Sequence, residues 1–425
     1  MDNAMTECVG TDSAPLERGA KPSSVKDEGA AVSAAAQRSA LYALALGTFA
    51  VGTEGFMIAA ILPSIAHSLS ISVQVAGQLV TIFALVYAVS SPFLTALTAS
   101  LNRRHLLMLA LAAFMVANLV AALAHSFWAL AAARVLLALT AGLYVPNANA
   151  VAGAIVPAAW RGRALAIVNG GITVAVAIGV PLGAVVGVHL GWRYTFVAVA
   201  VLSAVALTVL GAILPRNIAG SPPASIQARL AVATMPGAFE ALATTTLWAT
   251  GAYAVYTYIS PFLASATGLA ADRAGFVLTL FGVAALGGVA LGGIATDRIG
   301  ARRVQSFSLP VMAATFAALS VSAWLLAPHA LPVIVPLVAC WGLSAWAFYP
   351  PQQSRLIDVA GAQNTPVILS LNASFMYLGF SLGAAIGSLT ITLLSITWIG
   401  AVGAACLLGA MALSRLAWGR SRSIY

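Results

Sequence analysis

Charged side chains are scarce in this sequence. Only 7% of its 425 residues are Asp, Glu, Lys or Arg, whereas 61% are hydrophobic, and the mean hydropathy is +0.97. A soluble protein of this length could not bury so much apolar surface. The composition therefore excludes a soluble globular fold and indicates an integral membrane protein.

Cysteine pairs and nucleotide-binding motifs are also missing. Cys8, Cys340 and Cys406 lie far apart, so we expect no disulfide and no metal cluster. No P-loop is present, which argues against ATP as the energy source. Residues 379–383 match the G-x-S-x-G pattern of hydrolases, but inside an apolar span rather than at a strand-to-helix turn. We therefore expect no enzymatic activity and no cofactor.

Long apolar runs dominate what is present. The sequence contains twelve, at 41–64, 77–98, 106–124, 127–150, 164–188, 194–214, 237–259, 275–296, 305–327, 331–350, 366–390 and 398–417. About twenty apolar residues suffice to cross a bilayer as a helix. This predicts an all-α membrane protein with twelve transmembrane helices. We divide it into a disordered tail (1–39, without the apolar region of a signal peptide), a six-helix bundle (40–214), a central cytoplasmic loop (215–236), a second six-helix bundle (237–418) and a short tail (419–425).

The positions of Lys and Arg set the orientation. With both termini in the cytoplasm, seventeen of the twenty basic residues fall on the cytoplasmic side. Arg193 and Arg273 fall outside and Arg134 lies within the membrane. This bias explains the net charge of +9 without nucleic acid. We expect a multi-pass protein of a bacterial inner or plasma membrane.

The two sets of six spans resemble each other. Leu62-Pro63-Ser64 at the end of the first span is echoed by Ser260-Pro261-Phe262 at the end of the seventh. Parallel repeats of this kind occur in transporters whose binding site lies between the two halves. We therefore expect two pseudo-symmetric bundles with a central site.

Glu54 is the only ionisable side chain in the first span. A carboxylate inside a membrane helix is costly and indicates a proton or ion pathway, the alternative being a neutral packing residue. Counted along their helices, Glu54 and Arg134 lie about 15 Å and about 10 Å from the external face. We expect the two to pair or to be linked through water. The alternative for Arg134 is that it extends to the external headgroups.

The segment 293–303, GIATDRIGARR, carries the most specific motif. It resembles the GxxxDRxGRR signature of the major facilitator superfamily, in which this loop locks one conformation. Gly300 permits a tight turn and Asp297 can pair with a neighbouring Arg. The resemblance implies a cytoplasmic gate formed by Gly293, Asp297, Arg298, Gly300, Arg302, Arg303 and, from the first half, Arg103 and Arg104. The alternative is a positive-inside anchor.

The copy of this motif in the first half is degenerate. Ala99 replaces the Asp and Asn102 replaces the Gly. A lock in this half cannot use that carboxylate, so its gating role stays open.

The fifth span carries Gly170, Gly179, Gly183 and Gly187, with Pro181 among them. The spacing resembles the antiporter motif of drug/proton exporters, although Ala184 and Val188 depart from it. Small residues at such intervals allow helices to pack closely, which is also the alternative explanation.

The residues around Glu54, Gly52-Thr53-Glu54-Gly55-Phe56, resemble the first helix of the proton-linked efflux branch, especially its sugar-efflux and chloramphenicol-resistance-like members. The resemblance covers nearly all of 41–418. It implies that Glu54 and Arg134 couple transport to protons. Burial favours the neutral acid and a nearby guanidinium favours the carboxylate, so such a site can bind and release a proton as water access alternates.

Cargo contacts are predicted among polar and aromatic residues within the spans. The expected cavity residues are Tyr87, Asn118, Asn149, Asn169, Tyr253, Tyr256, Trp341, Asn372 and Tyr377. Asn169 and Asn372 occupy comparable places in spans 5 and 11, which predicts facing positions across the interface. Each is equally explained as a helix-packing hydrogen bond. No further buried charge is expected, which favours a neutral or weakly charged, partly apolar cargo.

These observations predict a monomeric, proton-coupled exporter of a small organic molecule, either a drug such as chloramphenicol or a sugar. Its partners would be the cargo, protons and membrane lipid. Two alternatives remain at this point: a proton-linked or passive importer on the same fold, and a non-transporting receptor or scaffold.

Overall fold

The computed structural model describes residues 34–216, 218, 226–269 and 271–420, and within these ranges the chain is helical and has no strand. The predicted tails fall largely on 1–33 and 421–425, outside the described residues. At the boundary of the first tail, helix α1 already begins at Ala34, before the predicted boundary at residue 39.

The helices of the first half are α1 (Ala34–Ser68), α2 (Val73–Leu97), α3 (Arg103–Ala122), α4 (Phe127–Ala154), the short 3-10 helix η1 (Ala158–Trp160), α5 (Arg161–Val174), the π-helical turn η2 (Ala175–Gly179), α6 (Val180–His189) and α7 (Trp192–Ile213). Those that follow are α8 (Ile226–Ala233), α9 (Ala238–Tyr256), α10 (Ile259–Thr267), α11 (Ala271–Ile299), α12 (Ala301–Leu326), α13 (Leu331–Ala347), α14 (Tyr349–Leu393), the 3-10 helix η3 (Ile396–Trp398) and α15 (Ile399–Arg420).

Eleven helical segments of the described chain are long and apolar enough to cross a membrane. They match eleven of the twelve predicted spans. The remaining prediction, 237–259, corresponds to α9, whose hydropathy is lowered by Glu240 and by the threonines at 244–246. Because α9 packs between α14 and α15, these polar side chains do not need to face lipid.

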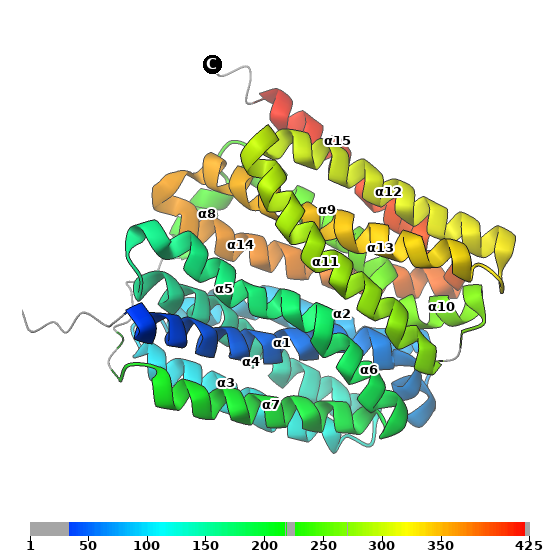
Figure 1. Ribbon diagram of the computed structural model, residues 1–425, viewed down its shortest axis with the longest axis horizontal. Coiled ribbons are helices and arrows are strands. Elements are labelled where there is room, and N and C mark those ends of the chain that lie inside the picture. The colour runs from blue at the N-terminus through cyan, green and yellow to red at the C-terminus, as the bar shows by residue number, and fades with distance from the viewer. Residues whose placement is uncertain (1–33, 217, 219–225, 270, 421–425) are drawn as a thin grey trace, which may run out of the picture.

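Helices α1–α7 and α9–α15 form two bundles that lie side by side (Figure 1). The main packing contacts between the halves are those of α2 on α14, of α11 on the α5–η2–α6 segment, and of α1 on α10 and α11. The prediction of two six-helix halves is confirmed. The central connection additionally contains α8, which the sequence did not predict.

Proline and glycine explain where helices are interrupted. Pro261 has no N–H to donate to the carbonyl of Thr257, and α9 gives way to α10 at residues 257–258. Gly361, at φ +74°, divides α14 into the end of the tenth span and the whole of the eleventh. At the break between α9 and α10, the side chain of Tyr258 is buried in the interior.

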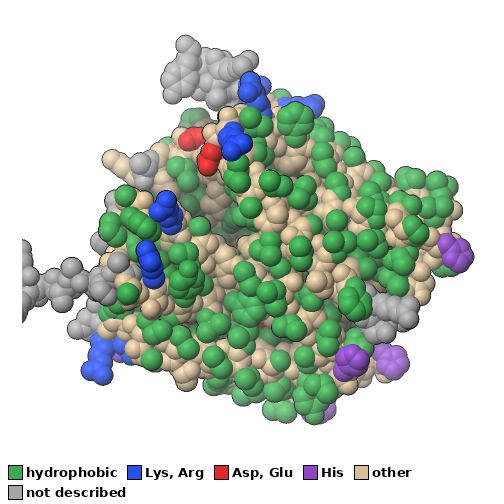
Figure 2. All heavy atoms as spheres, viewed as in Figure 1, with side chains coloured by type: hydrophobic (Ala, Val, Ile, Leu, Met, Phe, Trp, Pro, Cys, Tyr) green, Lys and Arg blue, Asp and Glu red, His purple; other side chains and the backbone are tan. Residues whose placement is uncertain are grey.

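The middle of the molecular surface is apolar, and one end carries charged side chains. Leu97, Trp128 and Phe276 are each 77% exposed, and hydrophobic side chains cover the visible face (Figure 2). Exposed apolar area of this extent requires lipid as its surroundings. The molecule is therefore a multi-pass membrane protein.

The two ends of the molecule differ in their basic residues. One, called the arginine end here, holds Arg38, Arg104, Arg161, Arg163, Arg216, Arg298, Arg302, Arg303 and Arg415, and both described chain ends. The opposite, histidine end holds His67, His125, His189 and His329.

Candidate functional site

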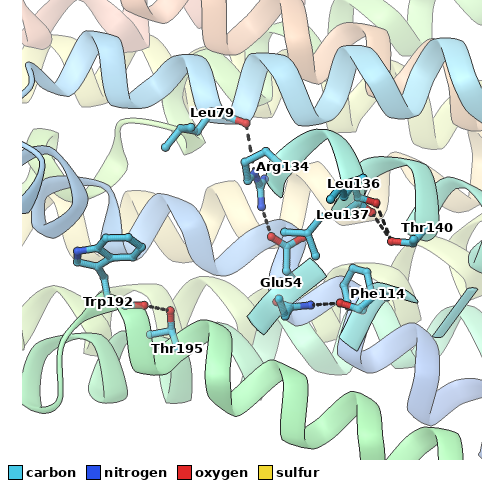
Figure 3. A network of polar contacts seen from close by, with 10 residues as sticks. Glu54, Leu79, Phe114, Arg134, Leu136, Leu137, Thr140, Trp192 and Thr195 are labelled. Atoms are coloured by element: carbon cyan, nitrogen blue, oxygen red, sulfur yellow. Dashed lines mark hydrogen bonds and ion pairs between the residues drawn. The ribbon is translucent and has the colours of Figure 1, made fainter. Parts of the chain in front are cut away.

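Glu54 and Arg134 form a buried ion pair at the centre of the first half (Figure 3). Arg134 Nη1 donates to Glu54 Oε1, and both side chains are 0% exposed. Glu54 comes from the middle of α1 and Arg134 from α4. The expected pairing is confirmed, and the alternative in which Arg134 reaches the headgroups is wrong. The role of the pair in transport stays a prediction.

The ion pair keeps unused hydrogen-bonding capacity. Arg134 Nε donates to the carbonyl of Leu79 at 3.3 Å, and its guanidinium carbon lies 4.3 Å from the centre of the Phe83 ring. Glu54 Oε2 and Arg134 Nη2 are buried without a hydrogen-bond partner among the described residues. Such atoms are costly unless another group satisfies them. Glu54 can therefore accept one further hydrogen bond, and Arg134 can donate one further hydrogen bond.

Helix α1 is held in place by a face of small residues on the α5–η2–α6 segment. The small residues include four glycines at which an added Cβ atom would overlap α1. Among the α1 atoms within 3.1 Å of such a Cβ are Phe49 N at Gly171, Thr53 Cβ at Gly179, Met57 Cβ at Gly183 and Ile61 Cγ2 at Gly187. By contrast, a Cβ on Gly170 would meet nothing within 4 Å. Sequence reasoning therefore missed Gly171, and Gly170 does not pack on α1.

Pro181 accompanies a change of helix type next to Glu54. Its missing N–H leaves the carbonyl of Ala177 without its α-helical partner, and residues 175–179 form the π-helical turn η2. Gly282 of α11 packs on this turn: an added Cβ would lie 2.9 Å from Ala177 N. The segment thus joins α1 to the second half.

Five predicted cavity residues belong to an aromatic cluster between the halves. Tyr87 of α2 stacks on Tyr377 of α14, and Tyr253 of α9 stacks on Phe380, each with ring centres 3.7 Å apart. The ring centre of Tyr256 lies 6.1 Å from that of Trp341, deeper in the second half.

Phe56 is a central member that the sequence analysis did not select. Two positions after Glu54, its ring enters the second half between those of Tyr253, Tyr256, Trp346 and Phe380, with ring centres 5.8–6.4 Å apart. The neighbouring cavity is lined by Gly55, Phe56, Val80, Phe83, Ala84, Tyr253, Tyr377 and Phe380 and has a volume of about 10 Å³. That is the lower limit for one water molecule. Cargo can enter only if the rings turn or the halves separate.

The predicted asparagines lie elsewhere, in three separate settings. Asn149 of α4 and Asn169 of α5 bond to each other through both amides, at 3.2 and 3.1 Å. Asn372 accepts from Thr245 at 2.7 Å within the second half. Asn118 is buried and donates to the carbonyl of Phe114. Asn169 and Asn372 each pair within their own half instead of with each other.

In the first half, the residues predicted for the gate bond within their own bundle. Arg103 is 6% exposed and donates to Asn147 Oδ1 at 2.5 Å. Arg104 donates to the carbonyls of Gly211 and Leu214 at 2.6 Å, so it caps the C-terminus of α7. Asn102, at the Gly place of the degenerate motif, caps α3 by accepting from Arg104 N. Its φ of −57° explains why this turn needs no glycine.

In the second half, Gly300 adopts φ +86° and begins α12, as the motif predicts. Asp297, Arg298, Arg302 and Arg303 are exposed, and Gly293 has open space beside it. Among the described residues, no basic nitrogen lies within ion-pair distance of Asp297. The expected pairing of Asp297 with a neighbouring Arg is not formed in this conformation.

A chain of buried amides crosses the arginine end of the second half. Gln305 of α12 donates to Gln352 of α14 at 2.7 Å, and Gln352 donates to Thr245 of α9 at 2.8 Å. Thr245 in turn donates to Asn372. No sequence pattern predicted this network, because each glutamine is individually typical of a helix surface.

Arg229 of α8 contacts both halves. Its guanidinium donates to Thr95 Oγ1 of α2 at 3.3 Å and to Ser370 Oγ of α14 at 3.1 Å. Burial lowers the pKa of this guanidinium. The loop helix α8 thus ties the two bundles together at the arginine end.

The protein resembles transporters from residue 44 to residue 423. The family model of the Major Facilitator Superfamily matches residues 44–372 and 241–423. YbcL, an MFS-type transporter of Bacillus subtilis, is 36% identical over 85% of this chain and 92% of its own length. The chloramphenicol resistance protein of Streptomyces lividans is 36% identical over 67% of this chain and 73% of its own.

The fold is also that of a solved structure. A bacterial homologue of the human lysosomal transporter Spinster, in an inward-facing and unoccupied conformation, superposes with a TM-score of 0.76 at 17% identity, covering 91% of this chain and 97% of that one. The paired helical bundles, the match of the family model and the relatives agree: the chain belongs to the Major Facilitator Superfamily and is a membrane transporter, not an enzyme.

Proposed function

We propose that this transporter exports a small, neutral or weakly charged organic molecule in exchange for protons, by alternating access. The observation that carries the proposal is the Glu54–Arg134 pair. It is buried beside the aromatic cluster between the halves and has one unsatisfied atom on each partner.

The orientation follows from the basic residues. Lys and Arg near membrane helices remain on the cytoplasmic side. The arginine end, with both ends of the described chain, is therefore assigned to the cytoplasm of a bacterial inner or plasma membrane. The arginine-rich turn between α11 and α12 would act as a gate when this end closes, because its exposed charges would then come near the first half.

Glu54 is suited to proton exchange because its carboxyl group is buried in the interior of the first half. Of the acids that the structure describes, Glu54 alone is buried. The ionised carboxylate leaves Oε2 free to accept a hydrogen bond from a hydroxyl or N–H group of the cargo. Protonation would remove the negative charge that strengthens this bond and place a proton on the group that the cargo uses. Cargo and proton would thus compete for Glu54.

The surroundings favour an aromatic cargo over a sugar. The cavity lining is mainly aromatic and apolar, and Tyr253 and Tyr377 are the lining residues whose side chains carry a polar group. Each buried sugar hydroxyl left unpaired would cost about 1–3 kcal/mol. A planar ring with one neutral polar group would instead stack on the tyrosines and reach Arg134. The chloramphenicol resistance protein among the relatives supports this choice.

Transport in everted membrane vesicles with an acidic interior tests the proposal. The wild-type protein should accumulate chloramphenicol and partly dissipate the proton gradient, whereas Glu54→Gln should do neither and still be inserted and folded. Asp358→Asn, which neutralises an exposed acid of α14, is the matched control and should behave like wild type. Concentrative uptake by Glu54→Gln would refute the coupling, and uptake driven by the opposite gradient would identify a symporter.

A further inference from the structure

We propose that Tyr258 and Gly77 form the contact that closes the histidine end of the transporter. The inference rests on alternating access, but not on the identity of the cargo or on proton coupling. Tyr258 belongs to the second half and Gly77 to the first, so the contact exists only when the two halves meet at this end.

Tyr258 reaches across the interface because of the break between α9 and α10. With φ −112° and ψ 18°, it lies outside both helices, and its side chain is 0% exposed. Its hydroxyl donates to the carbonyl of Ala384 on α14 at 2.9 Å. The ring is therefore fixed to its own half and directed toward α2.

Gly77 provides the space that receives this ring. The three heavy atoms nearest to an added Cβ all belong to Tyr258, with Cζ at 2.6 Å. The ring cannot retreat, because on α14 a Cβ added to Gly387 would lie 2.6 Å from its Cε2. Any larger side chain at Gly77 would therefore contact Tyr258 of the second half before it contacted a residue of the first half.

Other contacts show that this region is closed in the present conformation. One turn from Gly77, the carbonyl of Gln74 accepts from Ser388 Oγ at 3.3 Å. Deeper in the membrane, Tyr256 donates from its hydroxyl to the carbonyl of Phe56 at 3.1 Å. All these bonds join the two halves and must break when the histidine end opens. Of these three contacts, that at Gly77 alone depends on the absence of a side chain.

Gly77→Ala should therefore impair closure and leave each bundle intact. Overpacking at a rigid contact typically shifts a two-state balance roughly tenfold or more toward the state that relieves it. The matched control is Gly153→Ala in α4, where an added Cβ meets nothing within 4 Å. Tyr258→Ala removes the obstructing ring, so the double variant Gly77→Ala/Tyr258→Ala should close again.

Spin-label distance measurements in nanodiscs provide the test. Cysteines placed at His125 and His329, two exposed positions on opposite halves, carry the labels in a protein whose native cysteines are serine. Gly77→Ala should move the distance distribution to longer values, Gly153→Ala should not, and Tyr258→Ala should reverse the shift. Gly77→Val, which has a larger side chain, should give a greater shift than Gly77→Ala. Wild-type distances in both variants, or a shift that Tyr258→Ala leaves unchanged, would overturn the proposal.

Since the measurement uses neither cargo nor a proton gradient, its outcome is independent of the Glu54 experiment. If Glu54→Gln abolished proton coupling while Gly77→Ala closed like the wild type, the proposed function would stand. The proposed Tyr258–Gly77 contact would then be refuted as the gate.

Discussion

Two adjacent glycines in α5 should respond oppositely to the same substitution. A Cβ on Gly170 meets nothing within 4 Å, whereas one on Gly171 would lie 3.0 Å from Phe49 N and overlap the carbonyl of Ala45. Both obstacles are backbone atoms of α1, so they cannot rotate away as a side chain would. The pair therefore measures how tightly the helix carrying Glu54 is held.

The magnitude follows from two opposing effects. Replacing a helical glycine by alanine typically stabilises a helix by about 0.5–1 kcal/mol. Overpacking costs about 1–3 kcal/mol. Gly170→Ala should be neutral or slightly stabilising, and Gly171→Ala should be less stable than Gly170→Ala by about 1–3 kcal/mol.

Thermal unfolding of the two purified variants in the same detergent is the assay, with cargo transport as the second readout. Gly171→Ala should unfold at the lower temperature and transport more slowly, because displacement of α1 also displaces Glu54. Equal unfolding temperatures, or a greater loss in Gly170→Ala, would refute the packing register described above.

Two further predictions concern the arginine end. Arg229→Ala should loosen α8 from both bundles and increase protease cleavage near residues 226–233, with Arg216→Ala, which changes an exposed arginine, as the control; unchanged cleavage would argue against the bridging role. Gly300→Ala should lower stability by about 1–3 kcal/mol, because φ +86° with ψ 149° is a conformation that essentially only glycine adopts, whereas Gly293→Ala should not; equal unfolding temperatures would contradict the role assigned to the turn.

Much of the architecture could be predicted because membrane helices must satisfy their own backbone and face lipid with apolar side chains. The same physics predicted the Glu54–Arg134 pair, since two buried charges at similar depth in one bundle are costly when apart. Predicting the ion pair required only the depth of each residue along its helix, and that depth follows from counting residues.

Other features depend on rotation and tertiary contact. Gly170 and Gly171 differ by one position, and no count along the sequence reveals which faces α1. Phe56 looks like an ordinary apolar residue of its span, although its ring fills the interface. Asn102 departs from the motif, and only its cap on α3 explains how the turn forms without glycine.

Proton release upon cargo binding tests the central claim most directly. Chloramphenicol added to purified transporter in weakly buffered detergent should acidify the solution, because cargo and proton compete at Glu54. Glu54→Gln should bind without acidification. Binding by the wild-type protein with no proton release, or equal release from both proteins, would contradict the account.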